Sequence, residues 1–217
     1  MDLLEIKNIS KKIWFRPILQ DVTASFKKGT VTALVGKNGS GKTMLLRILA
    51  GLVQQNSGEI LIDGKNKNDL SKQEAPIIGL TIEHSGLYPQ LTAYQNLELL
   101  ARVRNIIKKD EIYDSIQRVG LDPKDNRPTR KYSLGMRQRL LIAQAIMEKP
   151  DLLLLDEPTS ALDEEGSDKI RSIMREEADR GAIVIIASHS KEDIRVCCDS
   201  VCYMKDGILT VEREGAG

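Results

Sequence analysis

Short apolar runs and alternating apolar and polar positions predict a largely β-sheet structure for the first part of the chain. Residues 18–26 alternate like a half-exposed strand, whereas 31–35 are almost continuously apolar and end in glycine, which is typical of a buried central strand before a loop. Residues 42–50 have helical composition and stop at Gly51, a common helix terminator. The other strands predicted here are 3–7, 59–62 and 77–82.

The pattern changes in the middle of the chain. From Thr92 to about Lys149 the apolar positions follow a helical period, broken near Gly120, Pro123 and Pro128, which predicts an inserted helical lobe. Strands and helices then alternate again. The strands are expected at 151–155, 182–187, 201–204 and 208–211, and the helices at 164–180 and 191–198. This alternation implies a parallel sheet covered on both faces.

The predicted fold class is therefore α/β, in a single domain spanning residues 1–217. Its core is expected from 1–83 and 151–217, with an antiparallel β region near the N-terminus. The helical lobe is expected at about 84–150.

Composition excludes several classes of protein. Apolar residues make up 41% and charged residues 29%, and the net charge is +1, so we expect neither charge-driven disorder nor a nucleic-acid partner. Aliphatic runs are far shorter than the roughly 20 residues of a membrane helix. The N-terminus carries acids where a leader would be basic, so we expect the chain to stay in the cytoplasm. The crowded Cys197, Cys198 and Cys202 favour structural thiols in a reducing compartment.

A phosphate-binding loop is predicted between the strand at 31–35 and the helix at 42–50. It matches the pattern of glycine, four residues, glycine, lysine, then serine or threonine. Lys42 is placed to reach the outer phosphates and the Thr43 hydroxyl to bind Mg²⁺, while backbone N–H groups and the helix N-terminus face the polyphosphate. The residues expected to contact the nucleotide are Gly36, Asn38, Gly39, Ser40, Gly41, Lys42 and Thr43.

Two carboxylates end the apolar strand that follows the helical lobe. At the carboxyl edge of a parallel sheet, Asp156 is expected to hold Mg²⁺ through its water shell, and Glu157 to orient or deprotonate the attacking water. Two acids at a strand end are alone a common surface feature. A phosphate loop that needs a metal-binding partner makes the functional interpretation stronger.

Three more motifs surround this strand: Tyr-Ser-Leu-Gly-Met-Arg-Gln-Arg at 132–139, Ser-Ala-Leu-Asp at 160–163, and His189. With the phosphate loop and the two acids, this ordered set resembles the nucleotide-binding subunit of ABC transporters over nearly the whole chain. The resemblance implies a P-loop NTPase (RecA-like) core and an ATPase that uses ATP and Mg²⁺. It also implies a homodimer or heterodimer that closes around two nucleotides and drives a separate membrane subunit, leaving the chain peripheral on the inner face of the membrane.

The resemblance assigns roles to these motifs. Ser133 and Gly135 match a signature whose helix N-terminus contacts the γ-phosphate held by the opposite subunit, although Leu134 and Met136 replace the usual glycine and glutamine. Residues 160–163, ending in Asp163, resemble the loop that couples the two sites across the dimer. His189 is similar to the histidine that contacts the γ-phosphate. His84 has no comparable position and is interpreted as an ordinary loop histidine.

Glu83 occupies the place where the family usually carries glutamine. A carboxylate can still bind Mg²⁺ or approach the attacking water, but it adds negative charge beside a polyphosphate. The alternative is that Glu83 is a surface acid and the contact is lost. Glu83 and the Tyr-Ser-Leu-Gly-Met signature are similar to the bacitracin-type and lantibiotic-type peptide export branch. A C-terminal extension usual in that branch is expected to be absent, because the sequence ends at Gly217.

Other assignments leave alternatives open. An aromatic side chain near the N-terminus stacks on adenine in this family, and Trp14 is our first choice. A shift of one residue in strand register would place Phe15 or Ile13 against the base instead. The alternative is that Trp14 is a buried structural residue. The segment 85–99 is where the resemblance places the membrane partner, although its apolar residues would also fit intradomain packing. The alternative function is a soluble ABC-type ATPase without a transport role, although no long coiled-coil insertion fits between the phosphate loop and the signature.

Overall fold

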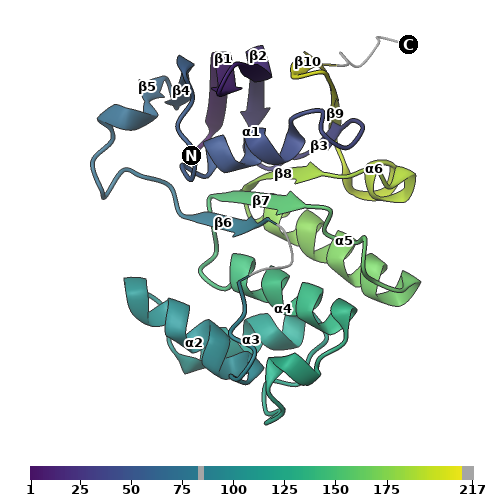
Figure 1. Cartoon of the computed structure of the whole chain (residues 1–217). Coiled ribbons are helices and arrows are strands. Elements are labelled where there is room, and N and C mark those ends of the chain that lie inside the picture. The colour runs from purple at the N-terminus through teal and green to yellow at the C-terminus, as the bar shows by residue number, and fades with distance from the viewer. Residues whose placement is uncertain (83–85, 212–217) are drawn as a thin grey trace.

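Two sheets lie on opposite sides of helix α1 (Lys42–Leu49) in the computed structural model, which describes residues 1–82 and 86–211 (Figure 1). The antiparallel sheet has the order β2-β1-β4-β5. Its strands are β1 (Leu3–Ile13), β2 (Arg16–Lys27), β4 (Ser57–Ile62) and β5 (Lys65–Asn66). This arrangement leaves α1 between an outer antiparallel sheet and an inner parallel one.

The second sheet has the order β10-β9-β3-β8-β7-β6, and all its pairs are parallel except the terminal pair β9 and β10. Its strands are β3 (Val31–Val35), β6 (Ile78–Thr81), β7 (Leu152–Asp156), β8 (Ile183–Ala187), β9 (Ser200–Lys205) and β10 (Ile208–Val211). The carboxyl ends of the parallel strands therefore meet at one edge, where the loops that follow β3, β7 and β8 lie together.

Alternate residues of the central strands pack into two separate cores. Leu152 and Leu154 of β7 join the core that contains α1 and the antiparallel sheet, whereas Leu153 and Leu155 join the core made with the remaining helices. All four side chains are fully buried, which explains why this strand is continuously apolar.

Helices cover the other face of the parallel sheet (Figure 1). The helical elements beyond α1 are α2 (Ala93–Arg104), α3 (Lys109–Arg118), α4 (Leu134–Ile146), α5 (Glu164–Asp179) and α6 (Lys191–Cys197), with short 3₁₀ turns at Lys67–Asp69 and Thr129–Lys131. Helix α4 approaches β6 so closely that a Cβ on Gly79 would come within 2.0 Å of the Ala145 carbonyl oxygen. The helical lobe is thus packed directly on the sheet through α4.

The predicted α/β class, with a parallel core, an N-terminal antiparallel region and a helical lobe, is confirmed. The main difference is β1, which extends to Ile13 instead of ending at residue 7, because it pairs with both β2 and β4 through several register shifts. The short strand β5 was not predicted, since two residues carry no periodicity. None of the helices in the described ranges has the length and apolar composition that crossing a membrane requires. Glu83, His84 and Ser85 lie outside the described residues.

Candidate nucleotide-binding site

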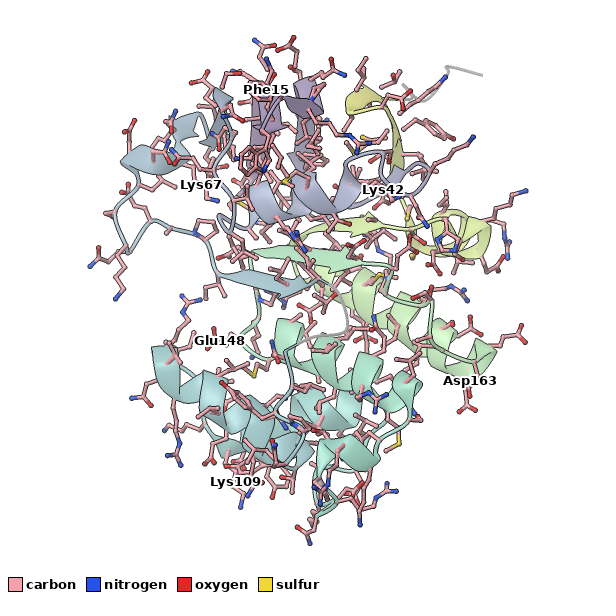
Figure 2. All side chains as sticks on the ribbon, in the orientation of Figure 1. Phe15, Lys42, Lys67, Lys109, Glu148 and Asp163 are labelled. Atoms are coloured by element: carbon pink, nitrogen blue, oxygen red, sulfur yellow. The ribbon has the colours of Figure 1, made fainter. Side chains whose placement is uncertain are left out.

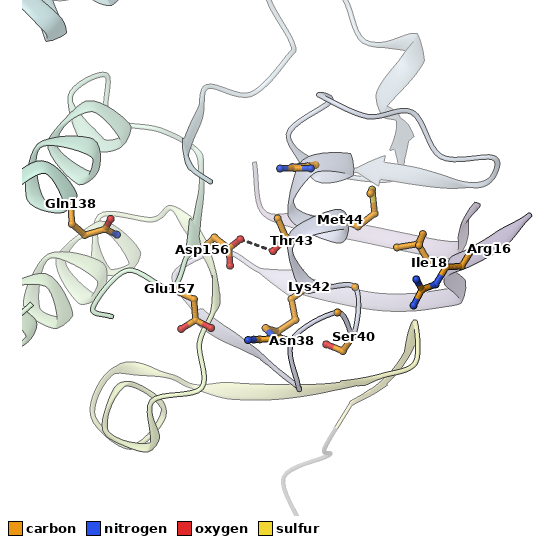
Figure 3. Close-up of a pocket in the computed structure, with 13 residues that line it drawn as sticks. Arg16, Ile18, Asn38, Ser40, Lys42, Thr43, Met44, Gln138, Asp156 and Glu157 are labelled. Carbon is orange, nitrogen blue, oxygen red and sulfur yellow. Dashed lines mark hydrogen bonds between the residues drawn. The ribbon is translucent and has the colours of Figure 1, made fainter. Parts of the chain in front are cut away.

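The loop between β3 and α1 folds around the side chain of Lys42. Its ammonium group donates hydrogen bonds to the backbone carbonyl oxygens of Gly36, at 2.6 Å, and Lys37, at 3.4 Å. The lysine is only 7% exposed, so its charge is held inside the loop at the N-terminus of α1 (Figure 3). A cation beside free helical N–H groups makes this an anion-binding position.

The β9–β10 hairpin packs against this loop. A Cβ on Gly36 would come within 2.2 Å of the Met204 carbonyl oxygen, so only glycine allows the loop to approach β9. The backbone N–H of Gly207, in the β9–β10 turn, donates to the Ser40 carbonyl oxygen at 3.1 Å. Gly41, at φ +109°, begins α1 in a conformation that favours glycine. The shape of the loop therefore depends on residues from the far end of the sequence.

Ser40 provides an internal test of whether the loop fits a phosphate. Its hydroxyl oxygen is buried and has no hydrogen-bond partner among the residues that the structure describes. An unpaired buried hydroxyl is destabilising by about 1–3 kcal/mol. A phosphate oxygen in the loop would accept this hydrogen bond, so the residues present fit a bound polyphosphate.

A cavity of about 590 Å³ opens in front of the loop (Figure 3). It is lined by Arg16, Ile18, Asn38, Gly39, Ser40, Gly41, Lys42, Thr43, Met44, Arg47, Gln138, Asp156 and Glu157. The phosphate loop and the two carboxylates therefore share one cavity with residues of the β1–β2 hairpin.

Thr43 and Asp156 meet across this cavity. The Thr43 hydroxyl donates to Asp156 Oδ2 at 2.6 Å, marked by the dashed line in Figure 3. Burial raises the pKa of Asp156, the Thr43 hydrogen bond opposes this, and the neighbouring Glu157 charge raises it further. A divalent cation would relieve that cost, and a carboxylate and a hydroxyl are oxygen ligands of the kind Mg²⁺ prefers.

The cavity offers few protein ligands to a metal. No group of three or more histidine, cysteine, aspartate or glutamate side chains converges as a metal site within the described ranges. Mg²⁺ characteristically keeps several waters and binds through one or two carboxylates together with substrate phosphates. The pair formed by Thr43 and Asp156 therefore fits Mg²⁺ that arrives with a nucleotide.

Glu157 and His189 form a second pair at the next strand edge. Glu157 Oε2 lies 2.9 Å from His189 Nδ1, and the Glu157 backbone N–H donates to the Ala187 carbonyl oxygen at 2.8 Å. Glu157 has φ +47°, an uncommon conformation for a residue with a side chain, and such strain is concentrated at functional sites. Glu157 lines the cavity. The more exposed His189 does not line the cavity but contacts the Glu157 carboxylate.

The remaining motif residues lie at helix starts outside this cavity. Ser133 caps α4 by accepting a hydrogen bond from the Met136 backbone N–H at 3.1 Å. Asp163 caps α5 by accepting from the Gly166 backbone N–H at 3.0 Å, and Figure 2 shows it at the edge of the molecule. A Cβ on Gly135 would come within 3.0 Å of a backbone oxygen in the loop before α5. None of the three lines the cavity of its own chain.

Trp14 lies at the exposed tip of the β1–β2 hairpin. Ile13 pairs with Arg16, which leaves Trp14 and Phe15 as the two turn residues, 92% and 98% exposed. The interpretation of Trp14 as a buried core residue is therefore wrong. Neither aromatic ring lines the cavity, and Arg16 and Ile18 do so instead.

Five lining residues were not predicted from the sequence: Arg16, Ile18, Met44, Arg47 and Gln138. Arg16 and Ile18 are two residues apart on one strand, so strand alternation would place them on one face once the hairpin register is known. Gln138 is 3% exposed, and its amide donates to the Pro158 carbonyl oxygen at 3.3 Å. A buried glutamine one turn into α4 was the available indication that this helix reaches the loop after β7.

The segment after residue 85 is only partly covered. Leu87 and Tyr94 pack against the helical core, which favours intradomain packing for these two side chains. Tyr88 and Leu99 are 54% and 43% exposed. Exposed apolar side chains therefore remain within 86–99.

This chain is similar to known ATP-binding proteins of ABC transporters. The ABC transporter family model matches residues 19–160. The uncharacterized ABC transporter ATP-binding protein YybJ of Bacillus subtilis is 47% identical, over 95% of this chain and 94% of its own. The lantibiotic transport ATP-binding protein SrtF of Streptococcus pyogenes is 35% identical, over 99% of this chain and 92% of its own. The bacitracin transport ATP-binding protein BcrA of Enterococcus faecalis is 33% identical, over 97% of this chain and 68% of its own.

A solved structure resembles the whole chain. The ATP-binding cassette MJ0796, in a dimeric post-hydrolysis state bound to ADP and phosphate, superposes with a TM-score of 0.87 at 27% identity, over 99% of this chain and 100% of its own. The relatives are transporter proteins, which supports the transport function over the soluble alternative. The chain belongs to the ABC transporter family, as an ATP-binding subunit with ATPase activity.

Proposed function

We propose that this chain hydrolyses ATP with Mg²⁺ in a nucleotide-sandwich dimer and thereby drives peptide export by a separate membrane subunit. The observation that carries the proposal is the convergence of Lys42, Thr43, Asp156 and Glu157 on one cavity. A polyphosphate site, a cation site and a candidate general base are the three elements that phosphoryl transfer to water requires. We treat residues 1–217 as one ATP-binding domain.

The residues divide this chemistry among themselves. The loop 36–43 binds and orients the phosphates through its N–H groups and Lys42. The Ser40 hydroxyl, which has no other partner among the described residues, donates a hydrogen bond to a phosphate oxygen. Thr43 and Asp156 would hold Mg²⁺, which stabilises negative charge on the phosphates when bound. Glu157 accepts a proton from water, and its contact with His189 holds the carboxylate at the edge of the cavity.

Two chains complete each site in this proposal. Ser133 is exposed at the N-terminus of α4 and, like Gly135 and Asp163, is absent from the cavity of its own chain. A helix N-terminus with an exposed serine is suited to binding a phosphate presented by another subunit. Sedimentation of the purified chain with ATP distinguishes a homodimer from a chain that needs a different partner.

Replacement of Glu157 by glutamine tests the catalytic assignment. The amide cannot take a proton from water, so we expect hydrolysis to fall on the order of a hundredfold or more while ATP binding persists and an ATP-bound dimer accumulates. Phosphate release and sedimentation with ATP and Mg²⁺ measure the two effects. The exposed Glu164→Gln variant, in the first turn of α5, is the matched control. Undiminished steady-state hydrolysis in Glu157→Gln would reject the assignment.

The membrane subunit is proposed to dock on 85–99. The exposed side chains of Tyr88 and Leu99 support this, and a bound membrane helix would cover them. The names of SrtF and BcrA support a peptide antibiotic as the cargo class. Purification of the chain from intact membranes, followed by identification of the polytopic protein that accompanies it, tests the docking proposal. Loss of that protein in a Tyr88→Ala variant, but not in an exposed control such as Lys124→Ala, is the expected result.

Glu83 is proposed as a further contact to Mg²⁺ or to the attacking water. Its carboxylate replaces the amide usual in the family, so Glu83→Gln is expected to retain or increase hydrolysis. Steady-state phosphate release at several Mg²⁺ concentrations measures this. Complete loss of activity would mean that the carboxylate itself is required.

A further inference from the structure

Asp193 is a fully buried carboxylate outside the nucleotide cavity, in the first turn of α6. Three side chains donate hydrogen bonds to it. Thr159 Oγ1 and Ser188 Oγ donate to Oδ2 at 2.7 and 2.9 Å, and Arg171 Nε donates to Oδ1 at 2.9 Å. The donors come from the loop after β7, the residue that follows β8, and helix α5. One carboxylate thus joins three separate segments of the chain.

Two of these segments carry the residues assigned to hydrolysis. Thr159 follows Glu157 by two residues, and Ser188 immediately precedes His189. The same two segments are joined by the hydrogen bond from the Glu157 N–H to the Ala187 carbonyl oxygen and by the contact between Glu157 and His189. Asp193 does not line the cavity, and it is joined to both loops through the neighbouring side chains of Thr159 and Ser188.

Stability alone is a weak reason for such an arrangement. Taking a carboxylate and a guanidinium out of water is costly, and a buried ion pair is often no more stable than apolar residues of the same volume. Arg171 is 8% exposed and also donates to Asp168 Oδ1 at 2.7 Å, so its own position is fixed from a second direction. The two oxygens of Asp193 with three directional donors specify a geometry, which an apolar cluster would not do.

We propose that Asp193 is a positioning residue for ATP hydrolysis. Its carboxylate sets the position of the Glu157 loop relative to the His189 loop, and it does so without contacting nucleotide. This inference rests on the proposed hydrolytic roles of Glu157 and His189. Reacting groups displaced by about 1 Å lose on the order of a hundredfold in rate, so the effect of Asp193 appears in kcat. The phosphate loop is bound by other contacts, so ATP affinity is unaffected.

The principal test compares Asp193→Asn with Asp168→Asn. Both changes remove a carboxylate partner of the same arginine, but only Asp193 touches Thr159 and Ser188. For Asp193→Asn we expect kcat to fall roughly tenfold to a hundredfold, with KM and ATP affinity by calorimetry changed less than about twofold. Asp168→Asn is expected to match the wild type. A residue that only stabilised the fold would lower the melting temperature without this separation of kcat from KM.

A second measurement does not depend on turnover. The chain has two histidines, so ¹⁵N-labelled histidine gives two sets of ring resonances, and His189→Ala identifies which set belongs to His189. Without nucleotide, Asp193→Asn is expected to shift the His189 resonances, and Asp168→Asn to leave them in place. A folded Asp193→Asn protein with unmoved His189 resonances and unchanged kcat overturns the inference. If the wild type itself does not hydrolyse ATP, the proposed function fails, whereas the resonances still decide the positioning role.

Smaller changes keep the test valid if Asp193→Asn does not fold. Thr159→Val and Ser188→Ala each remove one hydrogen-bond donor to the Asp193 carboxylate. In both variants the carboxylate remains paired with Arg171, so no buried charge is left without a partner. Each is expected to lower kcat several-fold with ATP affinity unchanged, and each to shift the His189 resonances. Unchanged kcat and unchanged resonances in both variants overturn the inference.

Discussion

The two ends of the nucleotide cavity differ in how their residues are held. At the phosphate end, Lys42 is buried, Thr43 is hydrogen-bonded to Asp156, and the loop is supported by β9 and β10. At the hairpin end, Arg16 is exposed on the surface, and Trp14 projects almost entirely into solvent. In Figure 2, Phe15 marks the hairpin tip and Lys42 the loop, and Figure 3 shows Arg16 and Lys42 in the cavity.

This difference teaches which part of the site is formed before a ligand binds. The phosphate end has its charge, its hydrogen bonds and its backbone shape fixed by packing, so it binds without a large ordering cost. The hairpin end presents side chains that still have rotamer freedom and must become ordered on binding. We therefore expect substitutions at the phosphate end to have much larger effects than substitutions at the hairpin end.

The largest effect is expected for Lys42→Ala. It removes the buried ammonium that is proposed to bind the phosphates, and a hydrogen bond between charged groups is worth up to about 3 kcal/mol, so ATP affinity should fall about a hundredfold. Calorimetric titration with ATP measures this. Lys37→Ala is the control, because that lysine lies in the same loop with an exposed side chain. Equal losses in both variants would contradict a specific role for the buried lysine.

Gly36→Ala tests whether the contact with the β9–β10 hairpin sets the shape of the phosphate loop. The added Cβ would lie 2.2 Å from the Met204 carbonyl oxygen, so the loop must move, and we expect ATP affinity to fall at least about tenfold. Gly39→Ala has free space around its Cβ but φ +80°, and the left-handed conformation costs about 1–2 kcal/mol. A smaller loss in Gly36→Ala than in Gly39→Ala would show that the contact with Met204 does not set the shape of the loop.

Arg16→Ala and Trp14→Ala compare two residues within the hairpin end. Arg16 lines the cavity, and a guanidinium placed over a nucleobase ring contributes about 1 kcal/mol, so its loss should weaken ATP binding roughly fivefold. Trp14→Ala is expected to weaken binding less, because its ring does not line the cavity. Displacement of a fluorescent ATP analogue ranks the two variants. The reverse order would support Trp14 as the residue that stacks on adenine.

The smallest effect is expected for the stability of the nucleotide-free chain in Asp156→Asn. Folding raises the pKa of Asp156, so above that pKa the ionised carboxylate destabilises the folded state. Below the pKa of the unfolded chain the group is protonated in both states, and this cost disappears. Removing the charge should raise the melting temperature by a few degrees at pH 7, with the gain fading as the pH falls. Scanning calorimetry at several pH values measures it. A lower melting temperature at pH 7 would contradict the burial cost.

The phosphate end was predictable because its chemistry is encoded in contiguous residues. The pattern from Gly36 to Thr43 and the acids Asp156 and Glu157 depend only on a strand leading into a loop, so local sequence was sufficient to place them together. The elements around them were also predicted, since buried parallel strands are continuously apolar. The contact between Glu157 and His189 was not predicted; it arises because the two residues follow the neighbouring strands β7 and β8.

The hairpin end was not predictable, because its register depends on pairing between strands. Ile13 pairs with Arg16 after several register shifts, and one residue of slip would exchange the exposed and cavity-facing side chains. Asp193 was missed for a different reason. A single acid in a short helix gives no local indication that donors from three other segments surround it.

The support of the phosphate loop by Met204 and Gly207 has a consequence for how the chain acquires its site during synthesis. The motif from Gly36 to Thr43 is translated early, but the backbone that holds its shape is made only after nearly all the other elements. A nascent chain halted before Met204 thus carries the full motif in an unsupported form. Nucleotide binding should therefore begin only after that late hairpin has emerged from the exit tunnel.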